Sequence, residues 1–517
     1  MASIHRHDSM EARRFAPDGQ SEQPVTVRLR YAPSPTGDPH VGNIRTALWA
    51  WLHARRYGGQ FIVRLEDTDQ SRAVEGSLER IFESLRWLGI DWDEGPDIGG
   101  PFAPYVQSQR LDLYHEAADR LLADGTAYRC FCSSEELAEL RKGQQKAKLP
   151  TGYEGKCRAI APEEAAKRAE NEPHVVRFRM PDEGSTSFID GLRGKITVQN
   201  STQEDFVILK SDRFPTYHLA HVVDDHAMEI THIVRGEEWI PSAPRHVRLF
   251  EALGYELPEL IHNPVILGPD GGKLSKRHGA KSVLEYAEEG YLPDAVLNFL
   301  AMIGWGLDDH TEIISREQLL ESFDIHDLNP SPASFDTQKL EWMNGVYLRE
   351  MPEDELSELF AVQLERTLPA DVARPLDRGF VEELTPLVRE RVKLLTELTP
   401  MVDFFFQREI ETPPVDELLG KRYRKRPEAA LAALPVIADA IEALDGWSTE
   451  LIEERLRALA EELEEKPGDL FMLCRLAVTG KAITPPLFET MEIVGAERCV
   501  ARLRAAAEAL GAVAGDT

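Results

Sequence analysis

The sequence predicts an α/β domain built on a parallel sheet, followed by helical domains. Two observations carry this prediction. Residues 25–66 run from an extended stretch through a turn rich in proline and glycine into a helical stretch and a second extended stretch, which is the order of a β–α–β unit. From residue 353 to the end of the chain, apolar side chains recur at the spacing of amphipathic helices.

The elements of this unit follow from their periodicity. Residues 25–30 (VTVRLR) alternate as a half-buried strand does, residues 44–56 carry apolar side chains at helical spacing, and residues 60–66 form a second strand. Farther along, residues 205–210 (DFVILK) are predicted to return to this sheet, and residues 230–235 to form another strand. Ligands of a parallel sheet bind at the carboxyl ends of its strands.

The turn between the first strand and the first helix, residues 31–43 (YAPSPTGDPHVGN), is a candidate phosphate site. Gly37 and Gly42 allow the backbone to bend and a flat ligand to approach closely. The helix that follows offers unpaired N–H groups and a partial positive charge, which suit a phosphate. His40 stands at that position and could donate to a phosphate oxygen. A turn that binds nothing is the alternative interpretation.

A second candidate site is the basic loop of residues 268–277 (GPDGGKLSKR). Its glycines predict a mobile loop, and Lys273, Lys276 and Arg277 place positive charges at its tip. Such a loop can close over a triphosphate and neutralise charge that develops at the α-phosphorus. A solvated loop without a ligand is the alternative.

Together the two stretches resemble the paired signatures of class I aminoacyl-tRNA synthetases. Residues 40–43 (HVGN) resemble the H-I-G-H motif, with asparagine in the last place, and residues 273–277 (KLSKR) resemble K-M-S-K-S. The longer string APSPTGDPHVG is similar to that of bacterial glutamyl-tRNA synthetases. The likeness continues through RLEDTD, PTYHLAHVVDDH, RGEEW and WMNGVY, and it spans residues 25–350 most strongly.

The resemblance implies a Rossmann-like parallel-sheet catalytic domain with an α+β insertion, followed by all-α anticodon-binding domains. The expected domains are a disordered extension (1–24), the catalytic domain in two halves (25–105 and 216–257), an insertion that binds the acceptor stem (106–215), a stem-contact domain with the KLSKR loop (258–352), and two helical anticodon-binding subdomains (353–415 and 416–517).

The resemblance also implies the activity. Glutamate is activated by ATP, with Mg²⁺ on the phosphates, and is then transferred to the 3′ end of tRNA(Glu), in some relatives also of tRNA(Gln). Members of the family usually need bound tRNA before they activate glutamate. The residues expected to act in catalysis are His40, Lys273, Lys276 and Arg277. The residues expected to contact ATP are His40, Gly42, Asn43, Glu238, Trp239, Lys273, Ser275 and Lys276.

Glutamate needs cations for its two carboxylates and an acceptor for its ammonium group. Arg30 and Arg235 each end a predicted strand, and a guanidinium binds a carboxylate with two hydrogen bonds. The glutamate-binding residues that chemistry and resemblance indicate together are Arg30, Ala32, Ser34, Glu66, Tyr217 and Arg235. The alternatives are that the arginines lie on the surface, that Glu66 pairs with Arg64, and that Trp239 belongs to the core.

Three other functions compete with this one. A glutaminyl-tRNA synthetase is disfavoured because Arg235 would face a neutral amide. A truncated paralogue that glutamylates a modified base would lack the C-terminal half, which is present here. A tRNA-binding regulator with a dead active site is disfavoured by the intact His40, Lys273, Lys276 and Arg277.

The cysteines suggest a metal site rather than disulfides. Cys130 and Cys132 form a C-x-C pair, and Cys157 follows with Tyr153 four residues before it. Some relatives bind zinc with a C-x-C and C-x-H pattern, but Ala159 stands where the histidine would be. Tyr153 is therefore the candidate fourth ligand of a structural Zn²⁺, and free thiols are the alternative. Five cysteines in 517 residues favour a reducing cytoplasm.

Composition bounds the remaining partners. The chain lacks a run of 18 apolar residues and a secretory signal, so we expect no membrane contact and a cytoplasmic monomer. The net charge of -30 requires local basic patches for tRNA, and one hypothesis is a host with a salty cytoplasm. Residues 421–426 (KRYRKR) are the densest patch, with an aromatic suited to stacking on bases. The candidate tRNA-binding residues are Arg389, Arg391, Lys421, Arg422 and Arg424.

Overall fold

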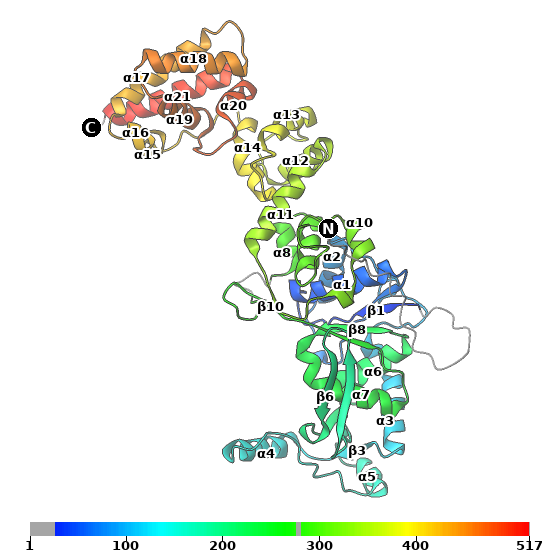
Figure 1. Cartoon of the computed structure of the whole chain (residues 1–517). Helices are drawn as coiled ribbons and strands as arrows, with labels where there is room; N and C mark the ends of the chain where they lie inside the picture. Colours follow the sequence, from blue (N-terminus) through cyan, green and yellow to red (C-terminus); the bar gives the residue numbers. More distant parts are fainter. Residues whose placement is uncertain (1–25, 276–280, 516–517) are drawn as a thin grey trace, which may run out of the picture. The chain divides into compact units, whose positions relative to one another are not determined.

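A computed structural model describes residues 26–275 and 281–515 of the chain (Figure 1). The chain divides into two compact units. Among the described residues, the first comprises residues 26–33, 50–68 and 92–262, and the second comprises residues 34–49, 69–91, 263–275 and 281–515. Lys276 and Arg277 of the basic loop lie outside the described residues.

The first unit is built on a mixed six-stranded sheet with the strand order β2-β1-β8-β9-β5-β6. Strand β1 (Arg28–Tyr31) pairs in parallel with β2 (Gln60–Val63) and with β8 (His232–Gly236). Strand β9 (Glu259–Asn263) pairs in parallel with β5 (Ser185–Asp190), which forms an antiparallel hairpin with the edge strand β6 (Gly194–Gln199). The predicted β–α–β unit is confirmed, with α1 (Val41–Arg56) as the crossover.

A second, three-stranded antiparallel sheet corrects one prediction. It contains β3 (Ala127–Cys130), β4 (Val175–Phe178) and β7 (Phe206–Leu209) in the order β3-β4-β7. Residues 205–210 therefore do not return to the main sheet, and that prediction was wrong. The run FVIL has the composition of a buried strand in either sheet, and its partner, β4, lies far back in the sequence.

Helices of the first unit pack against these sheets. Phe188 and Leu260 of the main sheet, Val176 and Phe206 of the small sheet, and Leu219 share one apolar core. The helices of this unit are α3 (Leu111–Ala123), α4 (Ser134–Lys146), α5 (Pro162–Ala169), α6 (Tyr217–Ala227) and α7 (Ala243–Leu253).

The part of the second unit that precedes residue 353 is almost entirely helical. It contains a short parallel strand pair, β10 (Ile266–Leu267) and β11 (Ala333–Ser334). Its helices in this part are α2 (Ser77–Trp87), α8 (Val283–Glu288), α9 (Pro293–Met302), α10 (Arg316–Ser322) and α11 (Thr337–Glu350).

The described residues from 353 onward contain helices and connecting segments without strands, as predicted. The helices are α12 (Glu353–Thr367), α13 (Arg378–Val388), α14 (Leu398–Phe406), α15 (Val415–Leu418), α16 (Gly420–Tyr423), α17 (Pro427–Glu442), α18 (Thr449–Glu462), α19 (Pro467–Thr479), α20 (Leu487–Val494) and α21 (Ala496–Gly515). Figure 1 shows α17 and α21 side by side, and they share one core. None of the described helices combines the length and apolar content that a bilayer crossing requires.

Candidate active site

The proline-rich turn ends on His40 at the first turn of α1. The Nδ1 atom of His40 accepts a hydrogen bond of 3.0 Å from the backbone N–H of Gly42. A neutral imidazole that accepts at Nδ1 carries its proton on Nε2, so His40 presents Nε2 as a donor. The first turn of α1 contains no acidic side chain, and Asn43 is exposed there. This arrangement suits a phosphate.

Gly42 permits this geometry because it has no side chain. A Cβ atom at position 42 would lie 2.9 Å from Cε1 and 3.0 Å from Nδ1 of His40. Both distances are shorter than ordinary van der Waals contact between carbon and ring atoms. The glycine therefore determines where the histidine ring can lie.

The basic loop begins as a tight hairpin. The backbone N–H of Leu274 donates to Ile266 at 2.9 Å, and that of Gly268 donates to Gly272 at 2.8 Å. Gly271 adopts a φ of +74°, a left-handed conformation that glycine adopts without strain. The hairpin leaves Lys273 exposed and Ser275 half-buried.

A buried charge network surrounds Arg30 in the first unit. Arg30 donates from Nε and Nη2 to the two carboxylate oxygens of Asp225, at 3.0 and 3.2 Å. Arg64 donates to Asp225 at 2.7 Å and to Glu66 at 3.0 Å. Burial alone would raise the pKa of Asp225, but Arg30 and Arg64 hold it well below its usual range. The pair between Glu66 and Arg64, which the sequence left as an alternative, is present.

Arg235 has a different environment from Arg30. Its Nε donates to Nε2 of His262 at 3.0 Å, and its Nη1 donates to Nδ1 of His246 at 3.1 Å. Its Nη2 is buried without a hydrogen-bond partner among the described residues. Burial lowers the pKa of Arg235. A buried guanidinium with an unpaired N–H edge is a site for a carboxylate ligand, because leaving the group unpaired is costly.

Aromatic rings lie around Arg235. Tyr217 packs 4.3 Å from Trp239 and 4.7 Å from His221, and the guanidinium of Arg235 lies 5.9 Å from the Trp239 ring. Tyr217 and Trp239 are both half-buried. The structure thus brings Tyr217 and Arg235, which were predicted to bind glutamate, together with Trp239, which was predicted to contact ATP.

The structure also gives the exposure of the other residues predicted for the site. Ala32 is half-buried just after β1, and Ser34 is exposed in the turn. Glu238 is exposed, and its carboxylate lies so close to Gly236 that a Cβ atom there would clash with it. The sequence did not indicate His246 or His262, because no local pattern marks a histidine that faces an arginine from another element.

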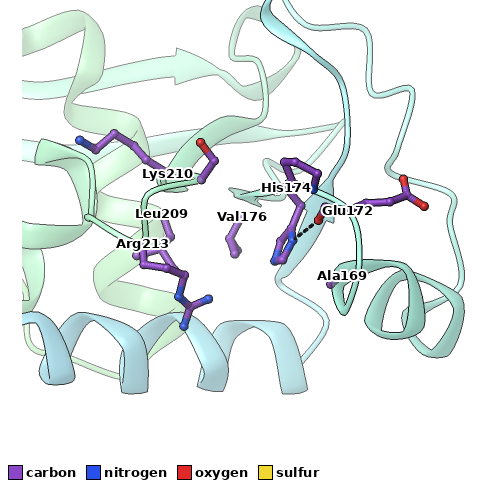
Figure 2. A pocket seen from close by; sticks show the side chains of 9 residues that line it. Ala169, Glu172, His174, Val176, Leu209, Lys210 and Arg213 are labelled. Carbon is purple, nitrogen blue, oxygen red and sulfur yellow. Dashed lines mark hydrogen bonds between the residues drawn. The ribbon is translucent and has the colours of Figure 1, made fainter.

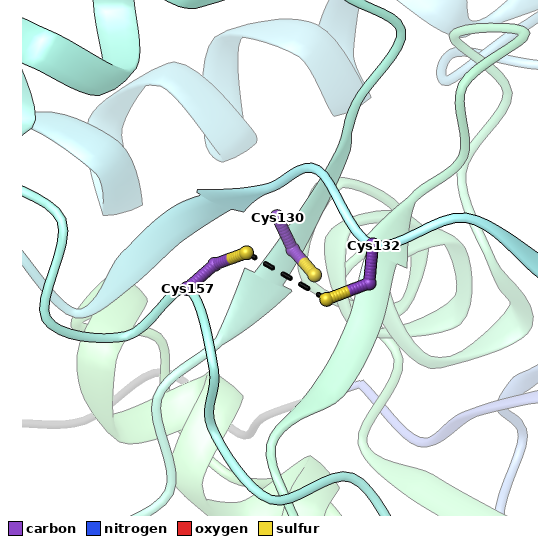
Figure 3. Close-up of side chains that lie close together, drawn as sticks. All are labelled: Cys130, Cys132 and Cys157. Atoms are coloured by element: carbon purple, nitrogen blue, oxygen red, sulfur yellow. Dashed lines mark hydrogen bonds between the residues drawn. The ribbon is translucent and has the colours of Figure 1, made fainter. Parts of the chain in front are cut away.

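Three thiols lie together in the first unit. Figure 3 shows the side chains of Cys130, Cys132 and Cys157 converging, with 3.7 Å between Sγ of Cys132 and Sγ of Cys157. The Tyr153 hydroxyl lies 3.4 Å from Sγ of Cys130, and the guanidinium of Arg177 lies 4.0 Å from the Tyr153 ring. Tetrahedral zinc with Zn–S bonds of about 2.3 Å would hold its sulfur atoms about 3.8 Å apart. The three thiols therefore lie close enough together to ligate one zinc ion, whereas the Tyr153 hydroxyl accepts from the Cys157 N–H at 2.9 Å and its pKa is raised by burial.

A separate cavity of about 180 Å³ opens beside α5 and the turn after β7. Figure 2 shows His174 and Arg213 on opposite sides of it, with Val176 between them. Lys210 also lines the cavity, and its ammonium group donates to the carbonyl of Thr68 at 3.1 Å. None of the predicted site residues lines this cavity.

The candidate tRNA contacts of the C-terminal helices are partly engaged within the protein. Arg389 donates to the carbonyl oxygens of Arg349 and Met351, whereas Arg391 is exposed. Arg422 pairs with Asp469 at 3.0 Å, and Lys421 and Arg424 are exposed.

One interpretation of the basic patch was wrong. Only 2% of Tyr423 is exposed, and its ring belongs to the helical core. The ring therefore does not stack on a base. The sequence KRYRKR alone does not reveal that the tyrosine is buried. In the short helix α16 and at the start of α17, the tyrosine faces inward while the basic residues stay outside.

Comparison with known proteins identifies the class. Residues 26–342 match the family described as tRNA synthetases class I (E and Q), catalytic domain, and residues 356–507 match an anticodon binding domain. The chain belongs to the class I tRNA synthetases, in the branch that serves glutamate and glutamine.

The relatives and the solved structure that the chain resembles are named as glutamate–tRNA ligases. The chain is 50% identical over 477 residues to a glutamate--tRNA ligase of Dehalococcoides mccartyi, which covers 92% of this chain and 97% of the relative. It is 44% identical over 501 residues to that of Acidothermus cellulolyticus, over 95% of this chain and 98% of the relative. A crystal structure of a glutamate tRNA ligase from Elizabethkingia meningosepticum in complex with its amino acid superposes with a TM-score of 0.82 at 36% identity, covering 93% of this chain and 99% of that one.

Proposed function

We propose that this enzyme is a glutamate–tRNA ligase, which activates L-glutamate with ATP and transfers it to the 3′ end of tRNA(Glu). The observation that carries the substrate is Arg235, a buried guanidinium with one N–H edge unpaired among the described residues. A neutral side-chain amide would leave that charge without a counter-charge, whereas a carboxylate supplies one.

The first step is an attack by the glutamate α-carboxylate on the α-phosphorus of ATP, which expels pyrophosphate. Such in-line chemistry depends on positioning and on neutralising charge. His40 donates from Nε2 to a phosphate oxygen, and Gly42 and Asn43 contact the nucleotide from the first turn of α1. Lys273, Ser275, Lys276 and Arg277 act on the phosphates from the KLSKR loop, and Glu238 and Trp239 contact the nucleotide.

Glutamate is held by charged groups in the first unit. Arg235 and Arg30 take the two carboxylates, Glu66 takes the ammonium group, and Tyr217 adds a hydrogen bond. The backbone around Ala32 and Ser34 also lines the site. Because Asp225 already occupies Nε and Nη2 of Arg30, the substrate shares Arg30 through Nη1. Arg235 has no such competing carboxylate among its hydrogen-bond partners, and it therefore dominates the affinity for glutamate.

The second step passes the glutamyl group to a ribose hydroxyl of tRNA. The basic residues Arg391, Lys421, Arg422 and Arg424 are our candidates for contacts with the anticodon arm, and Arg389 is a weaker candidate because it is bound to backbone carbonyls. ATP brings Mg²⁺ on its phosphates without a dedicated protein cage. Cys130, Cys132, Cys157 and Tyr153 hold a structural zinc ion. We further propose a cytoplasmic monomer with the domain boundaries expected from the sequence.

The function is tested by charging purified tRNA(Glu) and tRNA(Gln) with glutamate and with glutamine in the presence of ATP. Glutamate on tRNA(Glu) alone identifies a discriminating ligase, and glutamate on both tRNAs identifies a non-discriminating one that requires a partner amidotransferase. Glutamine on either tRNA, or no charging, contradicts the proposal.

The role of the loop is tested separately by Lys276→Ala. We expect a large loss in the rate of adenylate formation with little change in the affinity for glutamate or tRNA, because charge neutralisation matters most in the transition state. Equal losses in rate and affinity would mean that the loop only holds the substrate.

A further inference from the structure

The partners of Arg235 differ in charge from those of the other buried arginines of the same site. Arg30 and Arg64 both donate to carboxylates, Asp225 and Glu66. Arg235 donates to two imidazole rings, and among the described residues it forms no ion pair. Hydrogen bonds at two of the three guanidinium nitrogens therefore fix the orientation of the Arg235 side chain. Its positive charge has no counter-ion in direct contact among the described residues.

The first imidazole, His262, is fixed in the acceptor tautomer from behind. Its Nδ1 lies 2.6 Å from Oδ2 of Asp190. Asp190 also accepts from the backbone N–H groups of Leu192 and Arg193, at 3.0 and 2.9 Å, and its pKa is lowered. The carboxylate is therefore ionised and accepts a hydrogen bond from the Nδ1–H group of His262. The Nε2 lone pair is then left for Arg235.

The second imidazole, His246, is fixed by a third histidine. Its Nε2 lies 2.8 Å from Nδ1 of His218. Because its Nδ1 accepts from Arg235, the neutral ring carries its proton on Nε2 and donates it to His218. Burial lowers the pKa of His246 well below its usual range and that of His218 to about 4. Both rings are therefore neutral at physiological pH.

We propose that His246 and His262 are positioning residues that orient Arg235 through neutral acceptors, so that its positive charge is reserved for a carboxylate of glutamate. This inference rests on the proposed function, since it assigns a purpose to the residue that carries glutamate specificity. A carboxylate in either place would hold the guanidinium equally well, but it would compete with the substrate for the same charge.

The test is a charge series at position 246. His246→Asn places an amide oxygen close to the position of Nδ1 and stays neutral. His246→Asp places a carboxylate there and differs from the asparagine variant only in charge. Each variant is assayed by ATP–pyrophosphate exchange with tRNA present, with glutamate and ATP varied in turn.

We expect His246→Asn to keep the glutamate KM within about threefold of the unmodified enzyme. His246→Asp should raise the glutamate KM by about tenfold or more, the factor for losing one charge-assisted hydrogen bond. The ATP KM and kcat should change little in both variants, since neither His246 nor Arg235 is among the residues that we propose to contact ATP. A glutamate KM that is the same in the two variants would overturn the inference.

A third variant keeps the inference testable if the aspartate variant does not fold. His246→Phe retains the ring volume and removes the acceptor, so Arg235 loses one of its two anchors. Its glutamate KM should rise several-fold above that of His246→Asn, and an unchanged KM would contradict a positioning role. Failure of the proposed function gives a different result, because the unmodified enzyme would then show no exchange that depends on glutamate.

Discussion

The substitution Gly42→Ala should separate activity from stability. The added Cβ atom would lie 2.9 Å from Cε1 of His40, so the ring must rotate away and the hydrogen bond from the Gly42 N–H to Nδ1 is lost. His40 is exposed, so its ring can move without disturbing the core. The fold should therefore tolerate the change, whereas a reaction that needs the ring in place should not.

The magnitudes have opposite signs. Alanine in a helix is favoured over glycine by about 1 kcal/mol, and losing an exposed hydrogen bond costs about 0.5–1.5 kcal/mol. The free energy of unfolding should thus change by less than about 1 kcal/mol. Losing an oriented donor to transition-state charge lowers kcat about 10²–10³-fold, or about 2.7–4 kcal/mol.

A double-mutant cycle with His40→Ala is the decisive assay. ATP–pyrophosphate exchange is measured for Gly42→Ala, His40→Ala and the double variant, with thermal unfolding midpoints as the control. If Gly42 acts through His40, its substitution should cost nothing further once His40 is absent. An equal loss in both backgrounds would refute this and would mean that the nucleotide approaches the Gly42 backbone itself. Full activity of Gly42→Ala would remove His40 Nε2 from the mechanism.

Three further outcomes are expected. Purified enzyme should contain about one zinc ion per chain by metal analysis, and Cys157→Ser should lose it; a metal-free native enzyme would leave free thiols as the answer. The side chain of Ser448 accepts from the Leu451 N–H at the start of α18, so Ser448→Ala should lower the free energy of unfolding in denaturant by about 1 kcal/mol, while Ser448→Thr, which keeps the hydroxyl acceptor, serves as the control. Burial lowers the pKa of His218 from 6.5 to about 4. Between these pH values the unfolded chain binds a proton at this residue and the folded protein does not. Stability is then lost as pH falls from about 6.5 towards 4, and His218→Gln should make that loss shallower in thermal melts; an identical slope would contradict the assignment.

The sequence predicted the elements whose signals are local. The β1–α1–β2 unit and the helical C-terminal part depend on local spacing, and both were confirmed. Two predictions failed where the outcome depended on distant partners. Phe206–Leu209 has the composition of a buried strand but pairs with β4, and Tyr423 points into a core built by α17, α19 and α21.

The residues of the candidate site divide in the same way, into those that local sequence signals indicate and those that depend on distant partners. Motifs and strand ends indicated Arg30, Glu66, Tyr217 and Arg235, which the structure places in the first unit. The acceptors of Arg235 could not be found in this way, because His246 lies on α7 and His262 on β9, and Asp190 ends β5. Only the tertiary structure brings these three elements to one guanidinium.

The buried network of Arg30, Arg64, Glu66 and Asp225 also bears on how substrate specificity can evolve. These four residues form ion pairs with one another, and Arg64 also lies 3.8 Å from a carboxylate oxygen of Asp224. Replacing any one of the four therefore leaves an uncompensated charge in the interior, which is strongly destabilising. Mutations there are acceptable mainly as compensating pairs, which makes intermediate sequences unfit. Arg235 is free of that constraint, since its imidazole partners carry no charge to balance. A lineage that exchanged glutamate for a neutral amino acid would therefore reach it by changing Arg235 first, and the four-residue network would remain as an ancestral feature.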